Sequence, residues 1–470
     1  MDLQIPGLSE IKKVHFTGIG GISMSGLAEI LKSRGCEISG SDLKLSPLTG
    51  KLSALGIKIF EGHSEANIDD ADIVVYTAAV KQDNPELTGA VSRGIPIIER
   101  ATLLGSIMDK YPYSVAVSGT HGKTTTSSMI ASILIEEGLN PTIHLGGELP
   151  KIGGTTYIGS EDYFVAEACE YCGSFLKFNP YLSLILNIEY DHVDCFKTLN
   201  DVSDVFRKFA SQTRENGAVI LCRDDSGAAS LVKAPELAGK KVITYGIKDK
   251  KGDWTIDELI FDKAGCPSFN VYYKNSLYCQ FHIGVPGLHN ASNSLAAIAA
   301  GHFLGCSAKA AKVALETFTN SKRRFEVKGI RNDIRIIDDY AHHPTEIRAT
   351  LAAASNIKAG RTFCVFQPHT YSRTKALLDE FSVSFSDADM VIITDIYAAR
   401  EKDTGEIHSS MLSEKIKSTG KSAIYIKDFN EIANWLSKNT EAGDIVLTMG
   451  AGDVFKIGEK FLSVPSMKQL

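Results

Sequence analysis

The sequence has no apolar run long enough to cross a membrane and no excess of positive charge. A membrane-spanning helix needs about 18 consecutive apolar residues, and no segment of the 470-residue chain approaches that length. With 50 lysines and arginines against 56 aspartates and glutamates, the formal net charge is −6. No overall basic field therefore attracts nucleic acid or an anionic membrane. We expect neither as a partner, and any anion-binding site must be local.

The chain also shows no secretory leader and no regular cysteine framework. Its first residues carry no basic segment followed by an apolar core, so we expect no signal peptide. The nine cysteines are odd in number and scattered, which predicts reduced thiols and a cytoplasmic protein. Cys169 and Cys172 have CxxC spacing without a second pair, and we interpret them as incidental rather than as a zinc or redox motif.

What the sequence does contain is a glycine-rich turn between a predicted strand, 113–117, and a predicted helix, 127–137. Such a turn presents backbone N–H groups to phosphates, a lysine reaches the outer phosphates, and the next hydroxyl can ligate Mg²⁺. Val117 stands where G-x-x-x-x-G-K-[ST] needs its first glycine, so the loop is a shortened variant. A plain tight turn with an exposed lysine is the alternative. The predicted triphosphate loop consists of Gly119, Thr120, His121, Gly122, Lys123, Thr124 and Thr125.

A second glycine turn lies near the N-terminus. A strand at 13–17 runs into Gly18-Ile19-Gly20-Gly21, a helix follows, and a second strand at 37–41 ends at Asp42. This is the logic of a dinucleotide-binding half, in which the helix N-terminus receives a diphosphate and the acid receives a ribose hydroxyl. Ser23 replaces the third glycine of G-x-G-x-x-G, so a tight turn without a ligand remains the alternative. His63, just beyond another predicted strand, is a further ligand candidate.

Polar side chains also follow strands in the middle of the chain. Glu167 follows the strand 163–166, and His192 lies in a polar segment after the strand 182–187. Because Mg²⁺ favours oxygen ligands, Thr124 and Glu167 suit a metal at the phosphates, with His192 as a nitrogen ligand or an orienting residue. Asn290 and Asn293 share one face of a predicted helix and could bind a base. A capping role is the alternative for Glu167, Asn290 and Asn293, and for His192 the alternative is a hydrogen-bonded loop histidine.

The last third of the chain returns to alternating strands and helices, with strands at 334–337, 362–366, 390–394 and 445–449. Polar clusters at 338–346 and 367–374 follow the first two strands, which indicates a ligand-binding face. Arg373 can bind a carboxylate in a fork. Length predicts about three domains. We expect a Rossmann-like domain at 1–109, a central P-loop ATPase-type domain with a mostly parallel sheet at 110–321, and a Rossmann-like α/β domain at 322–470.

Taken together, these segments closely resemble the Mur ligase family over essentially the whole chain. The motifs that carry the resemblance are 15–21 (HFTGIGG) with 24–26 (MSG), 119–126 (GTHGKTTT), Glu167 with 187–192, 289–290 with Asn293, 323–325 (RRF), 338–346, 367–374 and 449–453 (MGAGD). The glycine motif and the double histidine at 342–343 resemble the alanine-adding members. The resemblance implies an ATP-dependent ligase of the cytoplasm, monomeric or homodimeric, that makes a peptidoglycan precursor. It would join L-alanine to the lactoyl carboxylate of UDP-N-acetylmuramate through an acyl phosphate.

The resemblance also implies roles for individual residues. Lys123, Glu167 and His192 would be catalytic, with Mg²⁺ held by Thr124, Glu167 and His192. Adenine would lie near Asn290 and Asn293, and Arg324 and Asp339 would help to close the C-terminal domain over ATP. The amino acid would face Tyr340, His369 and Arg373. The first glycine turn would hold UDP rather than NAD, through Gly18, Gly20, Gly21, Ser41, Asp42 and His63. Cys169 and Cys172 stand where many family members carry acids.

Three other functions remain open from the sequence. A sister Mur ligase would attach a recovered murein peptide to UDP-N-acetylmuramate. A comparison of L-alanine with a murein tripeptide as the amine substrate distinguishes the two activities. A nicotinamide oxidoreductase would use the first glycine turn but leaves the second loop without a role. A non-catalytic nucleotide-binding regulator would release no phosphate in the presence of substrates.

Overall fold

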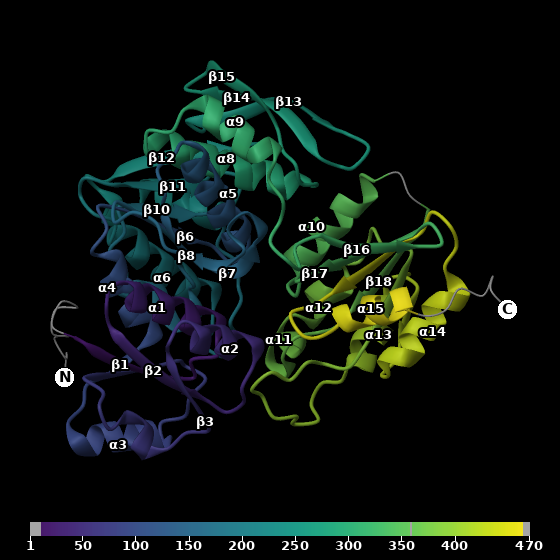
Figure 1. Ribbon diagram of the computed structural model, residues 1–470. Coiled ribbons are helices and arrows are strands. Elements are labelled where there is room, and N and C mark those ends of the chain that lie inside the picture. Colours follow the sequence, from purple (N-terminus) through teal and green to yellow (C-terminus); the bar gives the residue numbers. More distant parts are fainter. Residues whose placement is uncertain (1–10, 358–359, 464–470) are drawn as a thin grey trace. The chain divides into compact units, whose positions relative to one another are not determined.

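A computed structural model describes residues 11–357 and 360–463 (Figure 1). Residues 1–10, on which the expected absence of a signal peptide depends, lie outside this part. Contacts divide the chain into two compact units, and each is described by itself. Unit 1 comprises Met1–Ile188, Val202–Tyr245 and Ala296–Ala311, and unit 2 comprises Glu189–Asp201, Gly246–Leu295 and Lys312–Leu470. Among the described residues, no helix combines the length and apolar character that a membrane crossing requires.

The N-terminal part of unit 1 is a five-stranded sheet in the order β3-β2-β1-β4-β5, parallel throughout. The strand order reverses between β1 and β4, and open α/β sheets bind ligands beyond the strand ends at such a point. Phe16, Leu27 and Val75 are fully buried in its core. The elements are β1 (Lys13–Thr17), α1 (Ile22–Ser33), β2 (Glu37–Asp42), α2 (Pro47–Ala54), β3 (Lys58–Glu61), β4 (Ile73–Tyr76), α3 (Pro85–Arg93), β5 (Ile97–Glu99) and α4 (Arg100–Met108).

The remainder of unit 1 is built on a larger sheet whose strands run β12-β11-β10-β6-β9-β7-β8. All of these pairs are parallel except β7 with β8. The inner strands β6, β9, β10 and β11 are mostly buried, as expected for a parallel sheet covered on both faces. The edge strand β8 is polar and only partly buried. The elements are β6 (Tyr113–Ser118), α5 (Lys123–Glu136), β7 (Thr142–Leu149), β8 (Gly154–Tyr157), β9 (Tyr163–Glu167), β10 (Leu182–Ile185), α6 (Leu199–Ser211), β11 (Ala218–Cys222), α7 (Ser226–Ser230) and β12 (Lys241–Gly246).

An antiparallel meander follows, formed by β13 (Trp254–Phe261), β14 (Pro267–Tyr273) and β15 (Ser276–His282). The strands β14 and β15 form a hairpin around Lys274 and Asn275, and both residues have positive φ, +48° and +64°. Left-handed backbone at both central residues matches the twist of a two-residue hairpin. The helices α8 (Leu288–Phe303) and α9 (Ala308–Glu316) come next.

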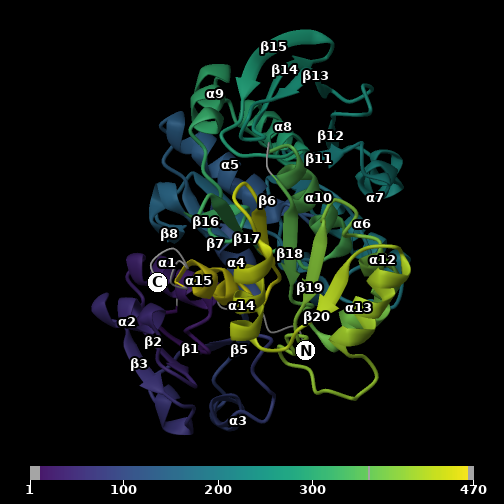
Figure 2. The same cartoon turned by 90° about the vertical axis from the view of Figure 1, so that its right-hand side faces the viewer.

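The C-terminal part of unit 2 is a six-stranded sheet in the order β16-β17-β21-β18-β19-β20. Two apolar cores flank it: one packs α10, α12 and α13 against the sheet, and the other packs α14 and α15 (Figure 2). Only β16 is antiparallel to its neighbour. The elements are β16 (Glu326–Arg331), β17 (Ile334–Asp339), α10 (Pro344–Ser355), β18 (Thr362–Phe366), α11 (Tyr371–Ala376), α12 (Leu378–Ser382), β19 (Met390–Ile393), α13 (Ser409–Ser418), β20 (Ala423–Tyr425), α14 (Phe429–Asn439), β21 (Ile445–Met449) and α15 (Phe455–Ser463).

Candidate active site

The predicted phosphate loop joins β6 to α5. Gly122 has φ +83°, in the left-handed region that favours glycine, and Lys123 is the first residue of the helix. No side chain of the described residues caps the start of α5. Its first N–H groups therefore remain available to an anion, as at other phosphate-binding helix ends.

Asn187 fixes the shape of this loop. Its Oδ1 accepts from His121 N at 2.7 Å, and its Nδ2 donates to His121 O at 3.1 Å. Thr120 N donates to the Asn187 carbonyl at 3.2 Å. Asn187 follows β10, the neighbour of β6 in the sheet. One side chain thus binds both the backbone N–H and the backbone C=O of His121 in the phosphate loop.

Lys123 is paired with a carboxylate that sequence reasoning missed. Its Nζ donates to Glu170 Oε2 at 2.9 Å and to the carbonyl oxygens of Gly119 and Thr120 at 2.5 and 3.2 Å. Burial acts to lower the pKa of Lys123, but the Glu170 carboxylate outweighs it and raises that pKa. Lys123 is therefore charged at neutral pH. Glu170 is almost fully buried, and its only signal in the sequence is its position three residues after Glu167.

Two of the three predicted metal ligands lie at this edge of the sheet. Thr124 is buried in the first turn of α5, and Glu167 ends β9, where its partner on β6 is Val117. Glu167 Oε1 accepts from Gly146 N at 2.6 Å. A hydroxyl and a carboxylate are the hard oxygen donors that fit Mg²⁺. His192 belongs to unit 2, so its part in the metal site stays a prediction.

The two cysteines beside Glu167 differ in state. Cys169 is a free thiol, and burial raises its pKa, so it is neutral at neutral pH. Cys172 is disulfide-bonded. The prediction of reduced thiols is therefore wrong for Cys172, whereas the interpretation of the CxxC spacing as incidental stays a prediction. The local sequence could not show this, because a disulfide depends on the approach of a second cysteine in space.

The first glycine turn uses most of its N–H groups internally. Gly18 N and Ile19 N donate to Ser41 O at 2.8 and 2.9 Å, and Gly20 N donates to Asp42 Oδ2 at 2.9 Å. Asp42 therefore stabilises the turn, while its predicted contact with a ribose stays a prediction. The next helix, α1, has no side-chain cap among the described residues, so its first turn offers the N–H groups that a diphosphate would need.

Beneath this turn lies a buried carboxylate, Glu86, that no motif indicated. It accepts hydrogen bonds at 2.7 Å from each of Thr17 Oγ1, Ser41 Oγ and Asn67 Nδ2, and His15 Nε2 lies 3.3 Å from its Oε2. Burial acts to raise the pKa of Glu86, but the hydrogen bonds of His15, Asn67 and Ser41 outweigh it and lower the pKa to about 2. Glu86 is ionised at neutral pH.

This charge sets the proton position on His63. An ionised carboxylate only accepts hydrogen bonds, so Ser41 must donate its single proton to Glu86. Ser41 Oγ lies 2.8 Å from His63 Nδ1 and must therefore accept from an Nδ1–H. In the neutral imidazole, Nε2 is then an acceptor. In this tautomer, Nε2 of His63 would accept an N–H or O–H from a ligand.

In unit 2, the two asparagines predicted to approach adenine are in contact with each other. Asn293 Nδ2 lies 3.3 Å from Asn290 Oδ1, and Asn290 Nδ2 donates to Pro286 O at 2.7 Å. Both side chains are buried at the start of α8. Asn290 thus ties the start of α8 to Pro286 through its amide donor, and both the capping role and the contact with a base stay predictions.

Asp339 organises the segment that contains Arg324 and Tyr340. It accepts from Phe325 N and Ala341 N, both at 2.7 Å. Burial raises the pKa of Asp339 to about 6, against the opposing effect of the positive Arg324. The Arg324 guanidinium lies 5.3 Å from the centre of the Tyr340 ring. The structure thus brings these three predicted residues together at the end of β17.

Arg373 already binds one carboxylate, that of Asp191. Its Nε and Nη2 donate to Asp191 at 2.8 and 3.2 Å, and Nη1 lies 3.0 Å from His369 Nδ1. Burial, followed by the charge of Arg373, lowers the pKa of His369 to about 4, so His369 accepts as a neutral ring. Of the five N–H groups of a guanidinium, two are left on Nη1 and Nη2. The carboxylate of an amino acid would bind to these two N–H groups.

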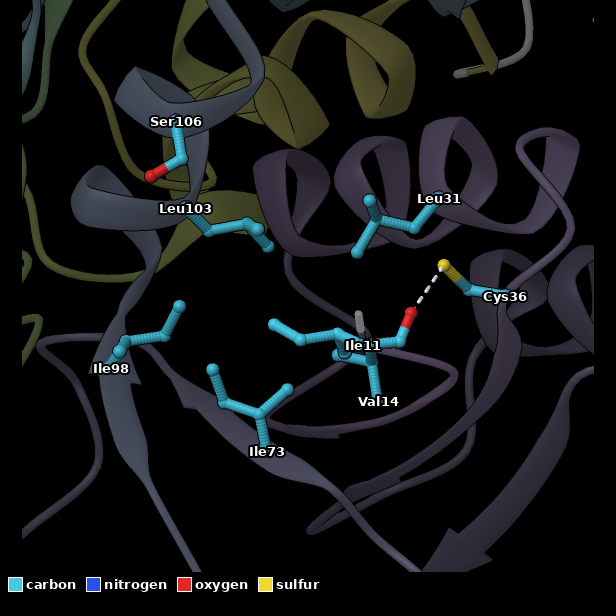
Figure 3. Close-up of a pocket in the computed structure, with 8 residues that line it drawn as sticks. All are labelled: Ile11, Val14, Leu31, Cys36, Ile73, Ile98, Leu103 and Ser106. Carbon is cyan, nitrogen blue, oxygen red and sulfur yellow. Dashed lines mark hydrogen bonds between the residues drawn. The ribbon is translucent and has the colours of Figure 1, made fainter. Parts of the chain in front are cut away.

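One apolar pocket in unit 1 is not part of these sites (Figure 3). It is lined by Ile11, Val14, Leu31, Cys36, Ile73, Ile98, Leu103 and Ser106. Its volume is about 10 Å³, room for roughly one water molecule. It is too small for a nucleotide, and its lining offers no charged group.

Comparison with known proteins identifies the family. The model of the Mur ligase family catalytic domain matches residues 13–112, the Mur ligase middle domain matches 117–301, and the Mur ligase glutamate ligase domain matches 323–452. The chain belongs to the Mur ligase family. The predicted family and the predicted three-domain α/β fold class are confirmed, while the domain borders at 109/110 and 321/322 stay predictions.

This Mur ligase is similar to alanine-adding members along its whole length. It is 57% identical over 465 residues to the UDP-N-acetylmuramate–L-alanine ligase of Acetivibrio thermocellus, covering 99% of this chain and 98% of the relative. The solved UDP-N-acetylmuramate–alanine ligase of Thermotoga maritima matches with a TM-score of 0.79 and 31% identity, over 96% of this chain and 98% of that one. A murein peptide ligase from Psychrobacter arcticus, 24% identical with a TM-score of 0.69 over 97% of this chain and 100% of that one, shares the fold.

Proposed function

We propose that this Mur ligase joins L-alanine to the lactoyl carboxylate of UDP-N-acetylmuramate, with conversion of ATP to ADP and phosphate. The product is a peptidoglycan precursor. The observation that carries the proposal is the 57% identity to the UDP-N-acetylmuramate–L-alanine ligase of Acetivibrio thermocellus over nearly the whole of both chains. The two helix-start loops support it, because they provide separate sites for a triphosphate and for a nucleotide sugar.

The reaction needs an activated carboxylate. A carboxylate oxygen of the sugar attacks the γ-phosphorus of ATP, which forms an acyl phosphate and releases ADP. The amine of L-alanine then attacks the acyl carbon, loses a proton, and expels inorganic phosphate that contains the original carboxylate oxygen. Lys123 stabilises the charge that spreads over the transferred phosphoryl group, and the loop N–H groups position it. Thr124 and Glu167, with His192 as the third predicted ligand, would hold Mg²⁺, which neutralises phosphate charge when it is bound.

The substrates divide among the sites as follows. The N–H groups of α1 bind the diphosphate of UDP, and His63 Nε2 accepts from the uridine. Asn290, Asn293, Arg324 and Asp339 serve ATP. Tyr340, His369 and Arg373 face L-alanine, through the two N–H groups of Arg373 that Asp191 and His369 leave. The enzyme acts in the cytoplasm.

Oxygen-18 in the substrate carboxylate tests the acyl phosphate. We expect the label in released inorganic phosphate, measured by mass spectrometry, only when Mg²⁺, ATP and L-alanine are all present. Product formation with unlabelled phosphate would exclude this chemistry. The same assay with a murein tripeptide in place of L-alanine tests the sister activity, for which we expect no phosphate release.

A further inference from the structure

Arg100 is a partly buried cation without an acidic partner. It is the first residue of α4, a position where the helix dipole disfavours positive charge. Nη1 donates to Ser23 Oγ at 3.0 Å, and no carboxylate of the described residues forms an ion pair with it. Burial lowers the pKa of its guanidinium, against weaker opposing effects of Cys169 and Glu99. The positive charge of a guanidinium in such a position is balanced only when an anionic ligand binds.

The guanidinium is held in place by a short network. Ser23 Oγ accepts from Arg100 and lies 2.8 Å from His144 Nε2. Burial, and then the positive charge of Arg100, lowers the pKa of His144 to about 3, so the ring is neutral. Ser23 donates to His144 Nε2, and His144 Nδ1, protonated, faces Thr156 Oγ1 at 3.4 Å. In this arrangement Arg100 Nη1, Ser23 Oγ and His144 Nδ1 each face an acceptor.

The network joins the first turn of α1 to β7, the strand whose Gly146 N donates to Glu167 Oε1 at 2.6 Å. Ser23 belongs to the first turn of α1, while His144 and Thr156 lie on β7 and β8. The contact is close, because a Cβ at Gly26 would lie 2.2 Å from Thr156 Oγ1. On the other side, a Cβ at Gly105 of α4 would lie 2.0 Å from Lys177 O. The helix that begins with Arg100 therefore packs against the segment that follows Glu170, the partner of Lys123.

We propose that Arg100 binds the carboxylate of the acceptor sugar nucleotide and selects an acceptor that carries this carboxylate. This inference rests on the proposed function. The carboxylate is the part of the acceptor that must reach the γ-phosphate of ATP, so its path lies between the two loops. A fork of N–H groups suits a carboxylate. The uncapped N–H groups of α1 remain for the diphosphate, so Arg100 is not needed there.

Calorimetric binding to three ligands tests this role. UDP and UDP-N-acetylglucosamine carry the diphosphate without a lactoyl carboxylate, and UDP-N-acetylmuramate carries both. For Arg100→Met, we expect the affinity for UDP-N-acetylmuramate to fall about 10- to 100-fold, the loss typical of a charged hydrogen-bonded contact. Affinities for the other two should change less than about threefold. Arg100→Lys, which keeps the charge without the fork, should fall between wild type and Arg100→Met.

Matched controls separate binding from folding. Arg34→Met removes a guanidinium from the opposite end of α1, where Arg34 lies over the Tyr111 ring, and should change none of the three affinities. ATP affinity and the thermal midpoint report whether each variant is folded. If Arg100→Met does not fold, Arg100→Lys and Ser23→Ala, which releases the guanidinium from its holder, provide the same comparison.

The outcomes distinguish a failure of the role assigned to Arg100 from a failure of the proposed function. An equal loss of affinity for all three ligands in the Arg100 variants would indicate that Arg100 binds the diphosphate, and would overturn the inference. Unchanged binding of all three would give Arg100 a purely structural role and would also overturn it. If wild-type protein does not bind UDP-N-acetylmuramate more tightly than UDP-N-acetylglucosamine, the proposed function itself fails.

Discussion

Replacing the buried Glu86 with glutamine should weaken the N-terminal domain by about 3 kcal/mol at neutral pH. The carboxyl pKa falls from 4.5 to about 2 in the folded protein, and each unit corresponds to about 1.4 kcal/mol. Since the folded pKa is the lower one, the stabilisation is complete above pH 4.5 and is lost as the pH falls toward 2. The hydrogen bonds that Glu86 accepts give a similar estimate of the destabilisation. A glutamine cannot accept from Asn67 and from both hydroxyls together, and each lost bond to a charged group contributes about 1.5–3 kcal/mol.

Hydrogen exchange in a urea series measures this effect locally. The amides of β1 and β2 should open about 3 kcal/mol more easily in Glu86→Gln than in wild type at pH 7, and the difference should shrink as the pH falls from 4.5 toward 2. Glu37→Gln, on the exposed side of β2, is the matched control and should change neither quantity. An unchanged opening energy at pH 7, or a difference independent of pH in this window, would refute the assignment of a charged Glu86.

Two further substitutions test the phosphate and amino-acid sites. Lys123→Ala removes the loop cation and should lower kcat by several orders of magnitude, with little change in affinity for the sugar nucleotide. Near-normal turnover in a steady-state assay would contradict the assignment of a triphosphate site to this loop. Arg373→Lys keeps a charge beside Asp191 but loses the fork, so the KM for L-alanine should rise about tenfold with little change in the KM for ATP. Lys375→Ala, an exposed cation two residues away, is its control, and equal effects on all three substrates would make Arg373 a structural residue.

The features that could be predicted from the sequence are those encoded over a few residues. Glycines next to a strand and a helix placed both strand–turn–helix junctions correctly, although their binding of nucleotides stays a prediction. The polar ends of β17 and β18 were found because strand ends are local signals. Glu170 and Glu86 escaped because their partners are distant in the chain: Lys123 lies 47 residues from Glu170, and Thr17 lies 69 residues from Glu86. No periodicity encodes such pairs, which the sheet order alone brings together.

Local spacing was right but insufficient for Asn290 and Arg373. The asparagines share a helix face as predicted, yet one amide donates to the backbone and the other lies against its neighbour. Arg373 has the predicted fork, yet Asp191, 182 residues away, occupies one edge of it. In both cases the residue type indicates which group can bind, while the tertiary contacts decide how many of its donors are left for a ligand.

The departure of the first glycine turn from the dinucleotide fingerprint has a physical consequence. A third glycine would let a pyrophosphate approach and the helix pack closely, whereas Ser23 places a hydroxyl there that accepts from Arg100 and donates to His144. Close packing is retained one turn later, at Gly26, against β8. The position that makes the motif imperfect for NAD therefore connects α1 to Arg100 and to His144. The role proposed above for Arg100 gives this connection a use in a ligase that must bring a carboxylate to ATP, whereas an oxidoreductase would have none.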